Sequence, residues 1–310
     1  MKNKLLLLLL FAIPFCASAQ DDLLKELEAS SDEKPKKEFT QGTFKTTRLI
    51  NTHTIESVGK NAFDLRLSHR FGDFKGGFNN FWGLDGGAPM RISAEFSLDG
   101  RFTFGVARTF TFGRSNNAVG KLWEGFAKYR ILRQTTDNKM PISVTAVAGL
   151  GITQQKAVQT PSEYKYFTSR MSYFYQIVIA RKFSKALSFQ VSPILVHNNL
   201  VVESGAKNDI WALAFGGRWK FSRSVALTAE YTCRLGNYGS SYLGTPFSSA
   251  YNTAGIGVDI ETGGHVFQIF IVNAQAISEL QFISDTKYSW NKIGDLRLGF
   301  NMSRVFGLKK

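Results

Sequence analysis

Strict alternation of apolar and polar side chains is the dominant pattern of this chain after Asn61. In the stretch AFDLRLSHRF, Phe63 and Leu65 fall on one face of an extended strand, and Asp64 and Arg66 fall on the other. A period of two residues is typical of β-strands with one apolar face, and a tilted strand needs roughly 9–11 residues to cross a bilayer. Twelve segments fit this description, at residues 62–71, 90–98, 101–112, 121–132, 141–152, 171–183, 186–196, 210–221, 225–235, 250–261, 265–273 and 295–306.

The connections between these segments alternate strictly between short and long. The five short connections are Asp99-Gly100, 133–140, Ser184-Lys185, 222–224 and 262–264. The six long connections are 72–89, 113–120, 153–170, 197–209, 236–249 and 274–294. Bacterial outer-membrane barrels are even-stranded meanders with short turns at one end and long loops at the other. The pattern therefore predicts an all-β fold, an antiparallel transmembrane β-barrel of about 12 strands (residues 61–310). A soluble exported β-protein is the alternative, since soluble sheets also alternate.

The two faces of the predicted strands differ in chemistry. The apolar faces carry Phe, Leu, Ile and Val, with aromatic residues towards the strand ends, where membrane barrels have aromatic girdles. The polar faces carry both charge signs and are expected to line the lumen. The lumen-lining candidates are Asp64, Arg66, Arg70, Arg91, Glu95, Glu124, Lys128, Arg130, Arg218, Glu230, Arg234 and Arg297. They form either an ion-pair network that supports the barrel or a constriction that selects anions.

The residues before the first strand fall into three segments. Lys2 and Lys4 precede the apolar run LLLLLLFAIPF, and the small residues Ala17-Ser18-Ala19 follow it, which is typical of a secretory signal peptide. We therefore assign residues 1–19 to a signal peptide that is cleaved near Ala19, and expect the mature protein in the cell outer membrane. Residues 20–39 are acidic and predict a mobile periplasmic leader, with a small docking helix as the alternative.

Residues 40–60 mix charged and apolar side chains, with Arg48, His53 and Glu56 among them. Their apolar content exceeds that of an ordinary linker. We expect either a plug or hairpin folded into the periplasmic mouth, which would close the lumen at rest, or a solvated linker.

The charge of the chain changes the choice of partner. With 38 Lys+Arg against 24 Asp+Glu and a sequence pI near 9.7, the chain first suggests nucleic acid. The signal peptide is removed and the leader is acidic, so the basic excess lies in residues 39–310. We therefore expect outer-membrane lipid, including lipopolysaccharide phosphates, and small anionic solutes as partners. A protein partner at the leader or long loops remains open, and nucleic acid is not expected.

A search for catalytic chemistry yields no candidate site. The four histidines are scattered, and neither an H-E-x-x-H nor a C-x-x-C pattern is present. His69 falls on the lipid-facing side of the first strand, but no second strand offers a matching Ser and Asn for a surface lipid hydrolase. Cys233 remains alone once the signal peptide is removed. We expect no catalytic residue, no cofactor and no metal, and therefore no enzyme.

Three stretches resemble a family of Gram-negative β-barrel proteins known as domain of unknown function 5777. They are TRLINTHTIESVGKNAFDLRLSHRFGDF, FWGLDGGAPMRISAEFSLDGRFTFGVARTF and GFAKYRILRQ. The family motifs correspond here to Thr47, Arg48, Asn51, His53, Asp64, Arg66, Ser68, His69, Arg70, Gly83, Leu84, Asp85, Arg91, Lys128, Tyr129, Leu132, Arg133 and Gln134. The resemblance covers most of the first half, is faint after residue 140 and departs at residues 86–89. It implies an outer-membrane barrel and no established activity.

Three functions follow from these observations. The first is a small pore or binding channel for small anionic solutes. The second is a non-conducting structural or interaction barrel that scaffolds an outer-membrane complex. The least favoured is a surface lipid hydrolase.

Overall fold

The computed structural model describes residues 38–86, 89–111, 121–154, 166–201, 207–236 and 251–308. The chain forms two compact units, Met1–Phe39 and Thr40–Lys310, and the barrel belongs to the second. The predicted signal peptide and nearly all of the predicted leader lie outside the described residues. Among the described residues, helices that are both long and apolar enough to cross a membrane are absent.

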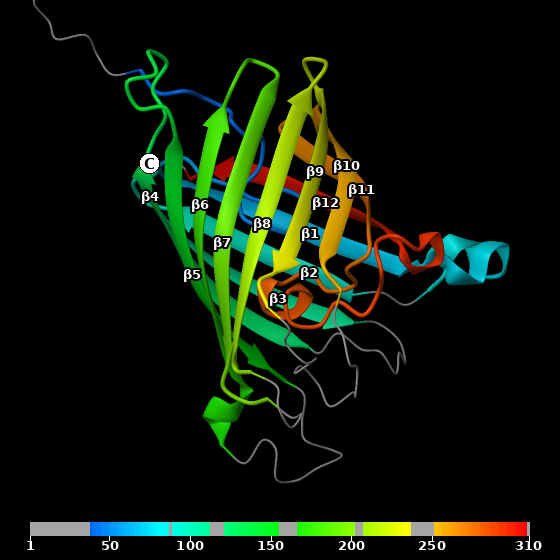
Figure 1. The fold of residues 1–310 in the computed structure, drawn as a ribbon. Coiled ribbons are helices and arrows are strands. Elements are labelled where there is room, and N and C mark those ends of the chain that lie inside the picture. The colour runs from blue at the N-terminus through cyan, green and yellow to red at the C-terminus, as the bar shows by residue number, and fades with distance from the viewer. Residues whose placement is uncertain are drawn as a thin grey trace, which may run out of the picture. The chain divides into compact units, whose positions relative to one another are not determined.

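Twelve antiparallel strands close into one barrel, in which each strand pairs with its neighbours in the chain and the last pairs with the first (Figure 1). They are β1 (Ala62–Asp73), β2 (Pro89–Ser97), β3 (Phe102–Thr111), β4 (Leu122–Leu132), β5 (Ser143–Thr153), β6 (Met171–Lys182), β7 (Leu187–Asn198), β8 (Asp209–Lys220), β9 (Val225–Arg234), β10 (Thr253–Thr262), β11 (His265–Val272) and β12 (Arg297–Gly307). Every strand begins and ends within three residues of its predicted bounds, so the predicted fold class and strand number are confirmed. Closure leaves no strand edge unpaired.

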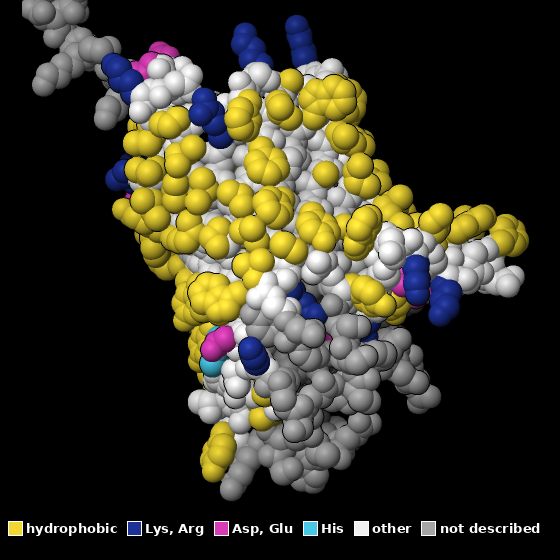
Figure 2. Space-filling model, viewed as in Figure 1, with side chains coloured by type: hydrophobic (Ala, Val, Ile, Leu, Met, Phe, Trp, Pro, Cys, Tyr) yellow, Lys and Arg dark blue, Asp and Glu magenta, His cyan; other side chains and the backbone are white. Residues whose placement is uncertain are grey.

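The exterior of the barrel is apolar. Along β2, for example, buried and more exposed residues alternate, as they must when one face points inward. Large hydrophobic side chains are exposed on the other face, among them Val106 and Trp219, at 63% and 56%. Figure 2 shows these side chains as a continuous band over the strands, with Lys and Arg above it at the short turns.

The interior has two chemically different halves. The charged candidates come from β1, β2, β4, β8, β9 and β12. The wall formed by β5–β8 presents mostly uncharged side chains to the inside, both polar ones such as Gln176 and Ser192 and apolar ones such as Phe174, Val178 and Ile194. Other parts of the chain pack against its apolar side chains.

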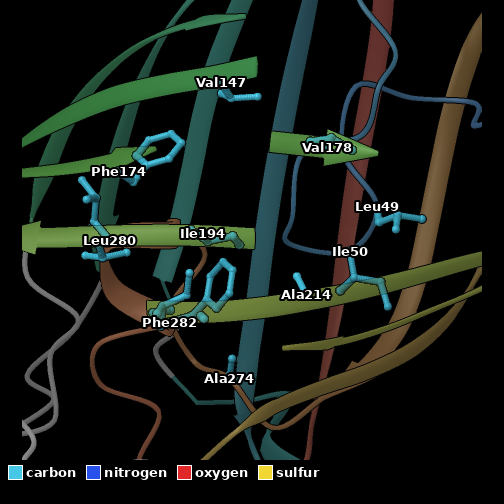
Figure 3. Close-up of a cluster of buried hydrophobic side chains, with 14 of the residues drawn as sticks. Leu49, Ile50, Val147, Phe174, Val178, Ile194, Ala214, Ala274, Leu280 and Phe282 are labelled. Atoms are coloured by element: carbon cyan, nitrogen blue, oxygen red, sulfur yellow. The ribbon is translucent and has the colours of Figure 1, made fainter. Parts of the chain in front are cut away.

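Two segments outside the strands fill the barrel. The N-terminal insert (residues 40–60) contacts β1, β4, β5, β7 and β9 at once, which places it inside. The loop insert (residues 273–289) enters from the long-loop end and contains the short helix α3 (Glu279–Phe282), which is wholly buried. Figure 3 shows Leu49 and Ile50 of the first insert, and Leu280 and Phe282 of the second, within the same apolar cluster as the inner wall.

Three further short helices lie at the long-loop end. They are η1 (Phe74–Gly83), η2 (Phe167–Arg170) and η3 (Ile293–Asp295). Of these, η1 and η3 contact each other beside the ends of β1 and β12. The connection between β1 and β2 therefore forms η1 and does not fold into the barrel.

Candidate functional site

The N-terminal insert folds into a tight hairpin at residues 47–54. Leu49 N–H donates to Thr52 O at 2.9 Å, and Thr54 N–H donates to Thr47 O at 2.9 Å. Arg48 and His53 form the antiparallel bridge between its two arms. The backbone of this segment therefore satisfies part of its own hydrogen bonding, and the remaining groups at the tip need partners in the barrel.

The tip of the hairpin is held between a carboxylate of β9 and a guanidinium group of β1, with three strands between them in the barrel. The Glu230 carboxylate of β9 accepts from Asn51 N–H at 3.0 Å and from Thr52 N–H at 3.2 Å. On the other side, Arg70 Nη2 of β1 donates to Asn51 Oδ1 at 2.6 Å. Hydrogen bonds to charged groups are stronger than neutral ones, so these two contacts fix the position of the tip.

Two inward-facing glycines make room for the apolar side chains beside the tip. A Cβ atom on Gly216 of β8 would lie 2.1 Å from Cδ1 of Leu49. A Cβ atom on Gly255 of β10 would lie 3.0 Å from Cδ1 of Ile50. The inner wall is thus complementary to the hairpin both in shape, through these glycines, and in charge, through Glu230 and Arg70.

Backbone carbonyl groups of the N-terminal insert accept hydrogen bonds from side chains of two more strands, β4 and β7. Lys128 Nζ of β4 donates to Glu56 O at 2.7 Å and to Thr47 O at 3.2 Å. Gln190 Nε2 of β7 donates to His53 O at 2.9 Å. The buried ammonium group of Lys128 thus has two backbone oxygens of the insert as hydrogen-bond acceptors.

The two inserts meet in the middle of the barrel. Arg48 Nη1 of the hairpin lies 2.8 Å from Glu279 Oε1 of α3, and both side chains are buried. Arg48 Nη2 also lies 2.8 Å from His53 Nε2. Since the guanidinium group can only donate, Nε2 of His53 accepts and the ring is neutral. Burial, and then the positive charge of Arg48, lower the pKa of His53 well below its usual value.

The loop insert has its own partners on the barrel wall. Ser278 Oγ donates to Glu124 Oε1 of β4, while Arg91 Nε of β2 donates to the other oxygen, Oε2, at 2.7 Å. The Arg297 guanidinium of β12 lies over the ring of Tyr288, 4.2 Å from its centroid. This insert is therefore fixed by charge-assisted contacts as the hairpin is.

A second polar network crosses the barrel wall at the side of β10 and β11. Arg66 Nη1 donates to Gln268 Oε1 at 3.0 Å, and Gln268 Nε2 donates to Asp259 Oδ1 at 2.9 Å. Arg218 Nε lies 3.9 Å from the other oxygen of Asp259. This network connects β1 to β8 through Gln268 of β11 and Asp259 of β10. Asn301 Nδ2 of β12 joins it to the hairpin, since it donates to Gln268 Oε1 and to Ile50 O, both at 3.0 Å.

The structure places the twelve lumen-lining candidates on the inner face of their strands. Ten are buried: Asp64, Arg66, Arg70, Arg91, Glu95, Glu124, Lys128, Arg218, Glu230 and Arg297. Arg130 and Arg234 lie near strand ends and are half-buried. In the N-terminal insert, Arg48 and His53 are buried, while Glu56 is half-buried and accepts from Phe44 N–H at 3.1 Å.

Several residues of this interior escape sequence reasoning. Gln268 has inward parity, which is a usable signal, but it carries no charge. Gly216 also has inward parity in a strand, where glycine marks a close approach. Glu279 lies in a long connection without any period, so its burial could not be predicted.

A polar cavity opens at the short-turn end, between the N-terminal insert and the last strands. Its volume is about 580 Å³. Its lining includes Lys45, Glu56, Asp64, Glu261 and His265. Lys45 Nζ and Glu261 Oε2 form an ion pair of 2.7 Å across it. The cavity leads from solvent to the hairpin, and ends there.

No cluster of three or more His, Cys, Asp or Glu suited to a metal ion occurs within the described ranges of the chain. His69 lies on the outer face with its ring 4.5 Å from that of Phe71, in an edge-to-face contact. Its surroundings are aromatic packing between neighbouring side chains.

The model of the family described as membrane bound beta barrel domain (DUF5777) matches residues 44–306, which confirms the resemblance noted in the sequence. None of the curated proteins matches the chain. Among solved structures, the KdgM porin is 9% identical, with a TM-score of 0.45 and coverage of 80% of this chain and 99% of that chain. A triple mutant of the Rhodopseudomonas blastica porin is 10% identical, with a TM-score of 0.30 and coverage of 70% and 55%. These identities and TM-scores are too low to transfer a function.

Proposed function

Because the chain belongs to the family of membrane-bound β-barrel domains designated DUF5777, we propose that it is an outer-membrane channel closed at rest by its two inserts. In this proposal the short-turn end, where β1 begins and β12 ends, faces the periplasm, and the long loops face outward. The channel is not an enzyme, and it passes small solutes when the inserts are displaced.

The observation that carries this proposal is that the barrel closes through pairing between its own strands, without a strand from either insert. All twelve strands close without them, since each pairs only with its neighbours. Neither insert adds a strand to the barrel, so displacement of either one leaves every hydrogen bond between the strands intact. The interior of a twelve-stranded barrel would then be open along its axis, because barrel diameter grows with strand number.

Selectivity for small anions is the finer part of the proposal. Among the twelve lumen-lining candidates, eight are Lys or Arg and four are Asp or Glu. When the hairpin leaves, Arg70 and Lys128 lose the oxygen acceptors that it supplies. Buried cations need replacement partners, and a small anion or water can provide them.

Conductance in planar bilayers tests this function directly. The wild-type protein should conduct rarely, and a variant that lacks residues 40–58 should conduct more often. Further removal of the loop insert, with residues 276–288 replaced by a short Gly-Ser linker, should give steady conductance with a reversal potential that favours chloride over potassium. Arg70→Ala in the open variant should weaken this preference, whereas Arg223→Ala, at an exposed short turn, should not.

Heat-modifiable mobility on gels should first establish that each variant is a folded barrel. A folded variant that lacks both inserts and still fails to conduct would overturn the channel proposal. A conductance without preference for chloride would retain the channel and remove only the anion selectivity.

A second candidate function is favoured by the apolar contacts of the inserts. Leu49, Leu280 and Phe282 are buried with Phe174 and Ile194 in one cluster (Figure 3), as in the core of a soluble domain. Such packing supports a permanently filled, structural barrel that holds an outer-membrane complex through its leader, long loops or lipopolysaccharide phosphates. This function predicts no conductance in the full-length protein under any condition. It also predicts that one specific partner, captured by cross-linking in whole cells, is lost when residues 20–39 are removed.

A further inference from the structure

The connection between β1 and β2 forms an arm that projects from the barrel wall at the long-loop end. We define the arm as residues 74–84, which comprise η1 and Leu84, together with residues 290–294, which lead into and form part of η3. In Figure 1 it is the pair of cyan and red coils that extends beyond the strands. The arm is attached where β1 and β12 end, since Phe74 N–H donates to Leu296 O at 2.9 Å.

Side-chain hydrogen bonds and a close glycine contact fix the conformation at the base of the arm. Asn80 Nδ2 donates to Asp73 O at 3.3 Å, and Asn80 Oδ1 accepts from Gly83 N–H at 3.2 Å. Gly72 and Gly83 approach so closely that a Cβ atom on Gly83 would lie 2.3 Å from Gly72 O. A loop held by side-chain bonds and by a glycine contact presents its remaining side chains in a defined direction.

Those remaining side chains are large, apolar and exposed. Phe78 is 79% exposed, Phe81 54% and Trp82 48%, and their neighbour Ile293 is 79% exposed. The Trp82 ring contacts both phenyl rings, at centroid distances of 5.8 and 6.1 Å. Phe81 and Trp82 have φ values of +47° and +51°, which is unfavourable for residues with side chains. This conformation turns aromatic rings outward and gains no burial within the barrel.

The apolar side chains of the arm face in a direction that indicates their partner. In Figure 2, hydrophobic side chains follow the edge of the arm that faces the apolar band of the barrel, and Lys and Arg lie on its other side. Lys75 and Lys292, both exposed, are the lysines of the arm. The apolar edge thus continues the surface that a membrane-bound barrel buries in lipid, and the charges lie farther from the membrane.

We propose that the arm lies on the outer leaflet, with Phe78, Phe81 and Trp82 inserted at the boundary between headgroups and acyl chains. Aromatic rings are favoured at this depth in membranes. Lys75 and Lys292 are then placed at the level of lipid phosphate groups, which they bind electrostatically. The arm anchors the barrel at its outer rim beside β1. This strand also carries Arg70, which binds the hairpin. This inference depends on the membrane location and not on channel activity.

Quenching of tryptophan fluorescence by brominated phosphatidylcholine tests the position of the arm. The full-length protein and the Trp82→Phe variant are reconstituted in vesicles of this lipid, brominated either near the headgroup end or near the methyl end of the chains. The difference between the two proteins reports Trp82 alone. We expect that difference to be quenched more by shallow than by deep bromine, and to be protected from iodide in water.

Trp290→Phe gives the matched comparison within the arm, and Trp219→Phe gives one on the opposite, short-turn rim of the barrel, since both side chains are about half exposed. Iodide quenching of Trp82 without any effect of bromine would overturn the proposal, because the ring would then face water. Protection from both quenchers, with a cross-linked dimer through residue 82, would also overturn it, because a second copy would then cover the arm.

Discussion

At the scale of single residues, Gly216 determines whether the hairpin can occupy its place. The Gly216→Val substitution puts a side chain where Leu49 lies, 2.1 Å from the new Cβ atom. Overpacking of a filled interior costs about 1–3 kcal/mol. We expect the hairpin to be displaced in part, with a lower urea midpoint and more frequent openings in planar bilayers.

The adjacent Gly217 provides the control, since it faces outward and the nearest atoms to a Cβ there are 4.0 Å away. Gly217→Val should leave both the midpoint and the openings unchanged. Equal behaviour of the two valine variants would contradict the contact between Gly216 and the hairpin.

His53 should make the stability of the filled barrel depend on pH. Its pKa is lowered by burial and by Arg48, so the folded protein keeps the ring neutral, while the unfolded chain binds a proton below about pH 6.5. Stability is then fully present above about pH 6.5 and falls as the pH decreases below it, by up to about 1.4 kcal/mol per pH unit. The urea midpoint in detergent, measured at pH values on both sides of 6.5, should follow this course.

The His53→Gln variant offers an oxygen acceptor to Arg48 but does not titrate in this range. Its midpoint should lack the additional decrease below pH 6.5 that the wild type shows. A decrease of the same size in both proteins would assign the pH dependence to other groups.

At the scale of elements, the sequence was sufficient for the strands and insufficient for what lies between them. The strand bounds and the inward and outward faces follow from the alternation of apolar and polar residues within each strand. This alternation is local and can be read directly from the sequence. The connection at 274–294 contains apolar residues such as Ile277, Leu280 and Phe282 but no period, so neither its burial nor α3 could be predicted. On the inner faces of β6 and β7, apolar residues such as Phe174, Val178 and Ile194 occur among polar ones, which indicates packing on that side but does not identify the segment that packs there.

The same distinction applies to the candidate site. Inward charges such as Arg70 and Glu230 could be named from parity within their own strands. Their partners could not, because Asn51 binds both from a segment that is distant in sequence from Glu230. The position of a charged residue along its strand shows whether its side chain faces the interior. Its partner there depends on which connecting segments enter the barrel.

At the scale of the whole molecule, the Arg48–Glu279 pair joins inserts that enter from opposite ends of the barrel. Arg48 belongs to the segment before β1, and Glu279 to the connection between β11 and β12, so no single strand links them. Removal of one partner from a buried ion pair costs about 3–5 kcal/mol, because the other charge remains buried without compensation. Arg48→Met and Glu279→Gln should therefore each lower the urea midpoint, and the double variant should be more stable than the sum of the two losses predicts.

In the proposed channel, the Arg48–Glu279 pair also couples the displacement of the N-terminal insert to that of the loop insert. If the inserts stabilise each other through this contact, either single substitution in the otherwise intact protein should increase openings in planar bilayers, and the double variant should open little more often than the single variants. Strictly additive midpoints would contradict the coupling. Additive effects on conductance with a coupled midpoint would mean that the pair stabilises the filled barrel while each insert opens by itself. In that case a solute would need to displace the two inserts one after the other, and the interior between them would serve as a chamber closed at both ends.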